Sequence, residues 1–325
     1  MPFDLRAVAL IQDSQLAPAG PNELLARLRT RFPELGEIAL QNADTLDWTP
    51  IAHQLAAEDA RHRWMAEHPK IEGVSAVFTV DDEPFALMYA PFSFPYNLAG
   101  EGLRPIRAFD PADALDRQLA HITISPVTPR KGDVIWTKAQ ATVMQASAAA
   151  ICDLVATSAV HWHSSQGFQS PDHVQEAAEE AVGGRSPIDY WMQFYPLRPS
   201  NPEFAGRDDL WGMLSLGLDP FTGREIELAN APISIKDAHM FSRATVWMLL
   251  DNGSVFRDRE TISMEDGSGL ATIRDRPEGW MRPGEGIGAY VLVRNNAVID
   301  PETLLVKGAR PEPKSRRGGW FRSRS

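Results

Sequence analysis

Strand-like and helix-like segments alternate along this chain, and that alternation restricts its fold more than any other feature. Residues 3–12, FDLRAVALIQ, predict a strand, and residues 22–32, NELLARLRTRF, predict a helix with its leucines on one face. Residues 74–80 and 84–90 are apolar segments on either side of an Asp-Asp-Glu turn, which predicts a hairpin. Hairpins among helices favour an α+β fold over a doubly wound parallel sheet. We expect mixed or antiparallel sheets with helices packed on one face.

A similar order of elements returns in the second part of the chain. Strand, helix, strand and hairpin follow one another in both parts, so two similar halves are expected, although no residues match at a fixed period. An amphipathic helix places Trp247 on a broad apolar face with Phe241 and Met248. The elements predicted here are strands at 120–126 and 158–163, helices at 133–157, 171–182 and 234–250, an extended segment at 190–197, a hairpin of 210–218 and 224–230, and short strands near 261, 271–274 and 289–294.

Composition divides the chain into three parts. Residues 91–111 are rich in Pro, Gly and aromatic side chains, as is typical of a linker or a long ordered connection. We therefore expect an N-terminal α+β domain at 1–110 and a C-terminal α+β domain at 111–306. Residues 307–325 combine Pro, Gly, Ser and Arg and predict a disordered basic tail.

The net charge of −11 conceals an opposition between this tail and the rest of the chain. The tail holds seven basic residues and one acid, a charge of +6, which leaves −17 on residues 1–306. Because each phosphate contact needs a cation, so acidic a body argues against DNA binding. The tail is the exception, since it could contact a membrane, RNA or an acidic surface. The oligomeric state is left open.

Cysteine usage and hydropathy indicate a cytoplasmic protein. Cys152 is the single cysteine, so no intramolecular disulfide can form, which suits a reducing compartment. Residues 1–15 lack the basic start and the long apolar run of a secretory signal. The longest apolar stretch, 134–161, is interrupted by polar side chains and is too polar for a membrane span.

Several short motifs follow one another between residues 120 and 294. They are Ala120-His121, Thr137-Lys138, Val160-His161-Trp162, Gly217-Leu218, Gly223, Glu225-Ile226-Glu227 and Thr261-Ile262. In this order they resemble an uncharacterised bacterial family, the domain of unknown function 4261. The sequence departs from the family at His161, where an aromatic residue is usual, and at Arg259-Glu260, where Asp-Gly is usual. The resemblance implies a common fold unit and a bacterial source, and it implies no activity.

Three histidines and a group of glutamates lie close together in the segment 159–181. On a strand, His161 and His163 point to the same side, and Glu176 of the next helix could approach them as a third metal ligand. The alternative is a structural strand that ends before a helix capped by Ser170 with Pro171 in its first turn. The ligand count favours the structural alternative, so we predict no metal site, with His161, His163 and Glu176 as the candidates to examine.

Carboxylates on the second hairpin form the next candidate site. Paired carboxylates can perform acid and base catalysis when they are held close together and unequally solvated. Glu225 and Glu227 share a face, whereas Asp219 lies in the turn. Charged residues usually occupy the solvent side of a hairpin, so we interpret these as surface residues.

No nucleophile and no cofactor site is predicted. Cys152 lies in an alanine-rich helix without a basic neighbour, which indicates a buried, inert thiol. No complete catalytic constellation is present, so we name no catalytic residue and no cofactor.

Aromatic residues give the best candidates for contact with another protein. Extended aromatic segments are typical of interaction surfaces. The tail adds an aromatic pair among basic residues, which suits contact with another molecule. The alternative is that the tail is a disordered end that only increases solubility. The candidate partner-binding residues are Tyr190, Trp191, Phe194, Trp320, Phe321 and Arg322.

From these features we expect a cytoplasmic, non-enzymatic bacterial protein whose acidic α+β body binds another protein. By association with bacterial families of this kind, an immunity or secretion-accessory role is the expected setting. The alternative is a metal-dependent or acid/base hydrolase that uses His161, His163 and the nearby carboxylates.

Overall fold

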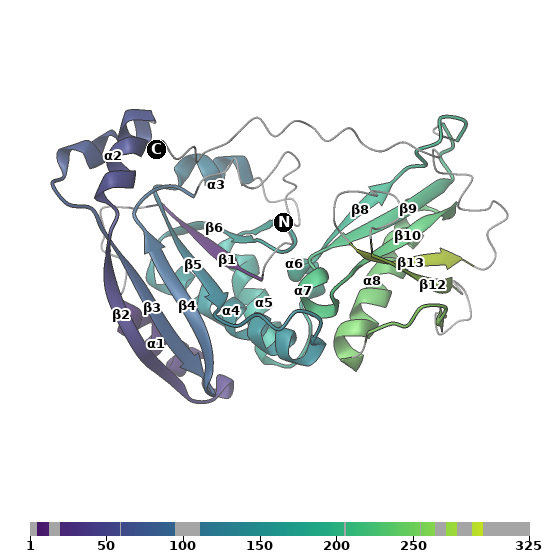
Figure 1. Ribbon diagram of the computed structural model, residues 1–325, viewed down its shortest axis with the longest axis horizontal. Coiled ribbons are helices and arrows are strands. Elements are labelled where there is room, and N and C mark those ends of the chain that lie inside the picture. The colour runs from purple at the N-terminus through teal and green to yellow at the C-terminus, as the bar shows by residue number, and fades with distance from the viewer. Residues whose placement is uncertain are drawn as a thin grey trace, which may run out of the picture.

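The alternating pattern produces two β-sheets with helices packed against them, and the α+β prediction is confirmed (Figure 1). The fold is seen in a computed structural model. It describes residues 5–12, 20–58, 60–94, 111–204, 206–253, 255–263, 271–277 and 288–294. The predicted tail at 307–325 and most of the predicted linker at 91–111 lie outside the described residues.

The first sheet has seven strands in the order β2-β3-β4-β5-β1-β6-β7, and every neighbouring pair is antiparallel. The interior strand β1 is apolar at all five positions and buried throughout, as a strand covered on both faces requires. The bounds are β1 (Ala7–Ile11), β2 (Ile38–Asp47), β3 (Glu72–Val80), β4 (Glu83–Ala90), β5 (Ala120–Pro126), β6 (Thr157–Trp162) and β7 (Gly167–Gln169).

The predicted hairpin is formed by β3 and β4. Asp81 and Asp82 connect the two strands, and both have positive φ angles, of 46° and 65°. Two consecutive left-handed residues make the type I′ geometry that matches the strand twist, and aspartate tolerates it well. The Asp81 carboxylate also accepts a hydrogen bond from the backbone N–H of Glu37 at 2.8 Å, which ties this turn to the start of β2.

Helices cover both faces of the first sheet. Side chains of α1, α4 and α5 pack with Ala7, Ala9 and Ile11 on one face. The opposite face carries Val8 and Leu10, which pack with α3. The helices of this half are α1 (Pro21–Arg31), α2 (Thr49–Glu58), α3 (Pro111–Arg117), α4 (Val134–Leu154) and α5 (Pro171–Val182), with 3-10 turns η1 (Pro33–Leu35) and η2 (Ala60–Glu67).

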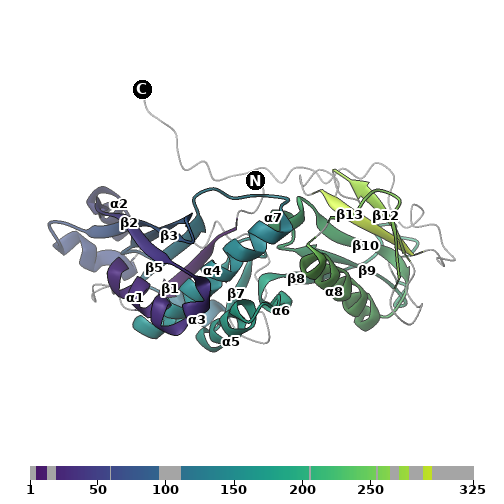
Figure 2. The ribbon, with the colours of Figure 1, turned by 90° about the horizontal axis from the view of Figure 1, so that it is seen from below.

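The second sheet has six strands in the order β11-β12-β13-β10-β9-β8. Strands β10 and β13 are parallel and the other neighbours are antiparallel, so this sheet is mixed. Helix α8 packs on one face of it, as both views show (Figures 1 and 2). The bounds are β8 (Gln193–Leu197), β9 (Leu210–Leu216), β10 (Glu225–Pro232), α8 (Ile235–Asn252), β11 (Thr261–Ile262), β12 (Ala271–Arg276) and β13 (Ala289–Arg294).

The two sheets divide the chain between β7 and β8 and not near residue 110. Strands β4 and β5 lie on either side of residue 110, yet they are hydrogen-bonded neighbours from Phe85↔Pro126 to Ala90↔His121. A strand pair within one sheet belongs to one folding unit, so residues 120–169 belong with the N-terminal strands.

Two short helices, α6 (Ile188–Trp191) and α7 (Asp219–Thr222), lie between the sheets (Figure 1). Trp162, Trp191 and Phe221 stack in a row there, with ring centroids 6.0 and 5.7 Å apart. The Trp191 indole N–H donates to the side-chain oxygen of Gln145 in α4 at 3.2 Å. This row belongs to a hydrophobic core cluster that contains buried residues of both sheets.

Both short helices differ from the sequence prediction. Tyr190 and Trp191 lie in α6, whereas an extended conformation was predicted, because backbone N–H groups of residues 190–192 bond back to Pro187 and Ile188. The expected hairpin turn DPFTG contains the helical turn α7, which ends at Gly223 with φ of 77°. No helix among the described residues is long and apolar enough to cross a membrane.

Candidate functional site

His161 lies on one face of β6, and His163 follows one residue beyond the end of that strand. Their ring centroids are 5.6 Å apart. His161 is fully buried beside Phe168, at 4.6 Å between ring centroids, and His163 is partly buried. His121 of β5 occupies the same face, and Phe94 contacts both His121 and His161 at 5.5 and 5.7 Å. The result is a histidine face packed with aromatic rings.

Burial keeps His121 and His161 neutral at pH 7. Burial lowers the pKa of His121 to about 4, although a contact between its Nδ1 and the carbonyl of Phe92 at 2.8 Å partly opposes that shift. Burial, and then the charge of His163, lower the pKa of His161 to about 3. Neither ring nitrogen of His161 has a hydrogen-bond partner within the structure as described. At pH 7 a neutral imidazole of this kind keeps a single N–H and does not carry the second proton that a general acid would donate.

The third metal candidate lies elsewhere. Glu176 belongs to α5, which packs with Trp162 on the other face of the sheet. Its carboxylate accepts a hydrogen bond from the Tyr190 hydroxyl. Within the described ranges, no group of three or more His, Cys, Asp or Glu side chains could hold a metal ion. The fold therefore separates Glu176 from His161 and His163.

Two of the aromatic candidates for partner binding, Tyr190 and Trp191, are not on the surface. Tyr190 is 2% exposed and Trp191 is fully buried in the row between the sheets, so their assignment as contact residues is wrong. Phe194 is partly buried and packs edge-on against His239 of α8. Trp320, Phe321 and Arg322 lie outside the described residues.

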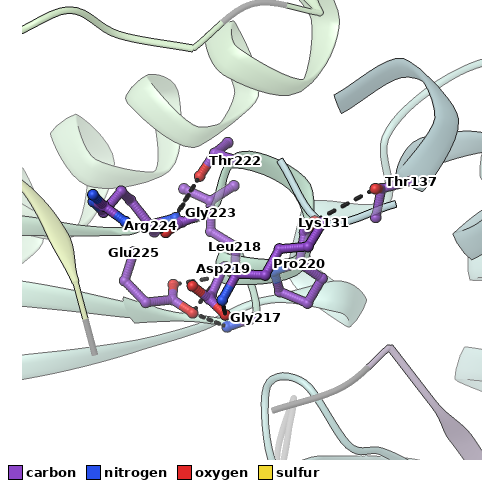
Figure 3. A network of polar contacts seen from close by, with 10 residues as sticks. All are labelled: Lys131, Thr137, Gly217, Leu218, Asp219, Pro220, Thr222, Gly223, Arg224 and Glu225. Atoms are coloured by element: carbon purple, nitrogen blue, oxygen red, sulfur yellow. Dashed lines mark hydrogen bonds and ion pairs between the residues drawn. The ribbon is translucent and has the colours of Figure 1, made fainter. Parts of the chain in front are cut away.

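The hairpin carboxylates are buried, against the prediction of a solvent-facing position. Glu225 is 1% exposed and Glu227 is 2% exposed. The Glu225 carboxylate accepts a hydrogen bond from the Ser215 hydroxyl at 2.7 Å. It accepts others from the backbone N–H groups of Gly217, Leu218 and Asp219 at 2.9 to 3.1 Å (Figure 3). The turn that precedes α7 supplies these donors, so the carboxylate holds the turn in place.

Burial dominates the ionisation of this carboxylate. It raises the pKa of Glu225 to about 7, even though the Ser215 hydroxyl and the three backbone N–H groups favour the charged form. A perturbed carboxyl group often marks a catalytic site. Here the chain's own donors occupy both carboxylate oxygens, and the group has no contact with solvent. We interpret Glu225 as a structural residue.

Helix α7 also attaches the second sheet to α4. The Lys131 ammonium pairs with the Asp219 carboxylate at 2.6 Å, and the N–H of Gly132 donates to the carbonyl of Pro220 at 3.1 Å. The hydroxyl of Thr137 lies 3.4 Å from the same carbonyl (Figure 3). The contacts of Glu225, α7 and the start of α4 thus connect the two sheets, and this group of residues is called the joint below.

The Cys152 residue is partly buried, whereas the sequence predicted a buried thiol. Burial raises the pKa of its thiol to about 12, with smaller effects from neighbouring groups. A thiol with this pKa is protonated at pH 7 and unreactive.

The exposed side of α8 is the feature that sequence reasoning missed. Met240 and Trp247 are 48% and 54% exposed, whereas Trp247 had been assigned to the buried apolar face. That buried face is formed by Ala238, Phe241, Thr245 and Leu249. Met240 and Trp247 are seven residues apart, so they lie on one side of the helix, opposite the buried face. That spacing was visible in the sequence and would have revealed a second apolar stripe.

Comparisons with known proteins add no relationship. The chain matches no family model, no curated protein and no solved structure. The resemblance in its motif order therefore remains a prediction.

Proposed function

We propose that this protein is a non-enzymatic protein-interaction module that binds through the exposed side of α8. The surface consists of Lys236, Met240, Ala244, Trp247 and Asp251 and is called the α8 face below. The observation that carries the proposal is the exposure of Met240 and Trp247 side by side on one helix. Single exposed apolar residues are ordinary, but a large Trp and a Met together are typical of contact surfaces.

The edges of the α8 face are held in place by ion pairs. Arg243 makes a bidentate pair with Asp189, at 2.8 and 3.0 Å, and this pair fixes α8 against α6. At the other end, Lys138 of α4 lies 3.5 Å from Asp251. A rigid apolar centre within paired charges binds with little loss of conformational freedom.

The buried polar residues support a binding role over catalysis. Glu225 is saturated by donors of its own chain, and His161 is neutral and enclosed by aromatic rings. We place the interaction in the bacterial cytoplasm, in an immunity or secretion-accessory setting, following the single cysteine and the motif order.

Co-purification from a bacterial host tests this function. Affinity-tagged wild-type protein should retain a protein in stoichiometric amount, either another chain or a second copy of itself. Trp247→Glu should lose it, because a charge would be buried at the contact. Ile51→Glu is the matched control, since Ile51 is 45% exposed and lies on α2 of the first sheet. Equal retention by wild-type protein and Trp247→Glu would overturn the proposal.

A further inference from the structure

We propose that the α8 face binds the α8 face of a second copy of this chain, in an antiparallel pair with twofold symmetry. This inference rests on the proposed function and names its partner. It is carried by the order of side chains along the α8 face.

The α8 face is self-complementary when its direction is reversed. Met240 and Trp247 lie at equal distances on either side of a point between Arg243 and Ala244. Lys236 and Asp251 lie at equal distances farther out. A twofold axis through that point therefore sets Met240 against Trp247 of the copy and Lys236 against Asp251 of the copy. Such reciprocal contacts define a closed, isologous interface.

The outer charges can pair across this interface. Lys236 is exposed and has no ion-pair partner in the part of the chain that the structure describes. The contacts of Asp251 with Lys138 and with the Ser186 hydroxyl both involve Oδ1, each at 3.5 Å. The Asp251 side chain is still 33% exposed, so an ammonium group of the copy can reach it. A parallel pair would instead bring like charges together, which costs free energy.

The centre of the face permits close approach of two helices. Ala244 has a single methyl group there, and small residues at a crossing let helix backbones come near each other. The Arg243 side chain is directed to Asp189 of α6 by its bidentate pair. Neither residue therefore blocks the axis.

Cysteine cross-linking combined with light scattering tests the pairing. Ala244→Cys lies beside the axis and should form a disulfide with its copy, which requires Cα atoms within about 7 Å. Lys236→Cys is the matched control, since in an antiparallel pair it lies about 22 Å from its copy at 1.5 Å per residue. Cys152 does not interfere because its thiol is protonated.

We expect wild-type protein to have the mass of two chains at micromolar concentration, and Trp247→Glu to have the mass of one. Circular dichroism of Trp247→Glu should match wild type, because the substituted side chain is at the surface. A single-chain mass for wild type at every concentration, or equal cross-linking of Ala244→Cys and Lys236→Cys, would overturn the antiparallel pair. If Trp247→Glu still loses another protein in co-purification, the proposed function stands while this inference fails.

Discussion

At the scale of single residues, His161 is unusual because it is buried and its ring nitrogens have no hydrogen-bond partner among the described residues. A buried polar group with no partner costs about 1 to 3 kcal/mol. His161 contacts Phe94 and Phe168, so an aromatic hydrocarbon ring would suit the same space.

Replacement of His161 by phenylalanine should therefore stabilise the fold. We expect His161→Phe to raise the free energy of unfolding at pH 7 by about 1 to 2 kcal/mol, because the unpaired ring nitrogens are removed and ring packing is retained. Urea denaturation measures this change. The same substitution at exposed His239 should shift stability by less than about 0.5 kcal/mol. A loss of stability in His161→Phe would contradict the account.

Glu225 predicts an unusual dependence of stability on pH. Its pKa in the folded protein, about 7, lies above the ordinary glutamate value of 4.5. The folded state therefore binds the Glu225 proton more tightly than the unfolded state does, and this difference stabilises the fold. The stabilisation is complete below pH 4.5 and is lost as pH rises through 7. The loss is on the order of 3 kcal/mol.

The variant Glu225→Gln cannot ionise and should lack this loss. Its amide fits the backbone donors poorly, which lowers stability by an amount that does not depend on pH. Relative to wild type, the variant should therefore gain stability between pH 5 and pH 8, as measured by urea denaturation at each pH. A difference that stays constant over this range would show that Glu225 ionises normally in the folded state.

At the scale of elements, the turn between β9 and α7 depends on Gly217. Its φ is 111°, and an added Cβ would lie 2.5 Å from the carbonyl oxygen of Trp191. Gly223 also has a positive φ, of 77°, but a Cβ there would meet nothing within 4 Å. Only the first position combines backbone strain with a collision against α6.

Alanine substitutions at these two glycines separate the cost of a positive φ from the cost of a collision between the new Cβ and α6. We expect Gly217→Ala to lower the free energy of unfolding by about 3 kcal/mol or more, and Gly223→Ala by about 1 to 2 kcal/mol. Thermal unfolding of both variants provides the comparison. Equal effects would mean that α6 does not pack closely against this turn.

Local patterns predicted most elements but not the buried joint. The β3–β4 hairpin and the long helices follow from short-range signals that are independent of distant residues. Glu225 illustrates the limit, because a glutamate on a hairpin reads as a surface residue. Its burial depends on Ser215 and on three backbone N–H groups in a turn that was predicted to be a simple hairpin loop.

At the scale of the whole molecule, the order of the strands in each sheet could not be predicted from the sequence. Pairing of β5 and β6 with β1 brings residues from both predicted domains into one sheet. Local periodicity specifies each strand but not its neighbours, so the linker-like composition of 91–111 suggested a boundary in the wrong place. The same limit explains Trp247, whose exposure depends on which side of α8 meets the second sheet.

The central claim is that the α8 face is covered by protein in the cell. Hydroxyl-radical footprinting of Met240 and Trp247 tests it most directly, with Met88 of β4 as an internal reference. In cells, both α8 residues should be oxidised several-fold less than in the dilute purified chain, while the reactivity of Met88 stays the same. Equal oxidation of Met240 and Trp247 in both samples would contradict the account.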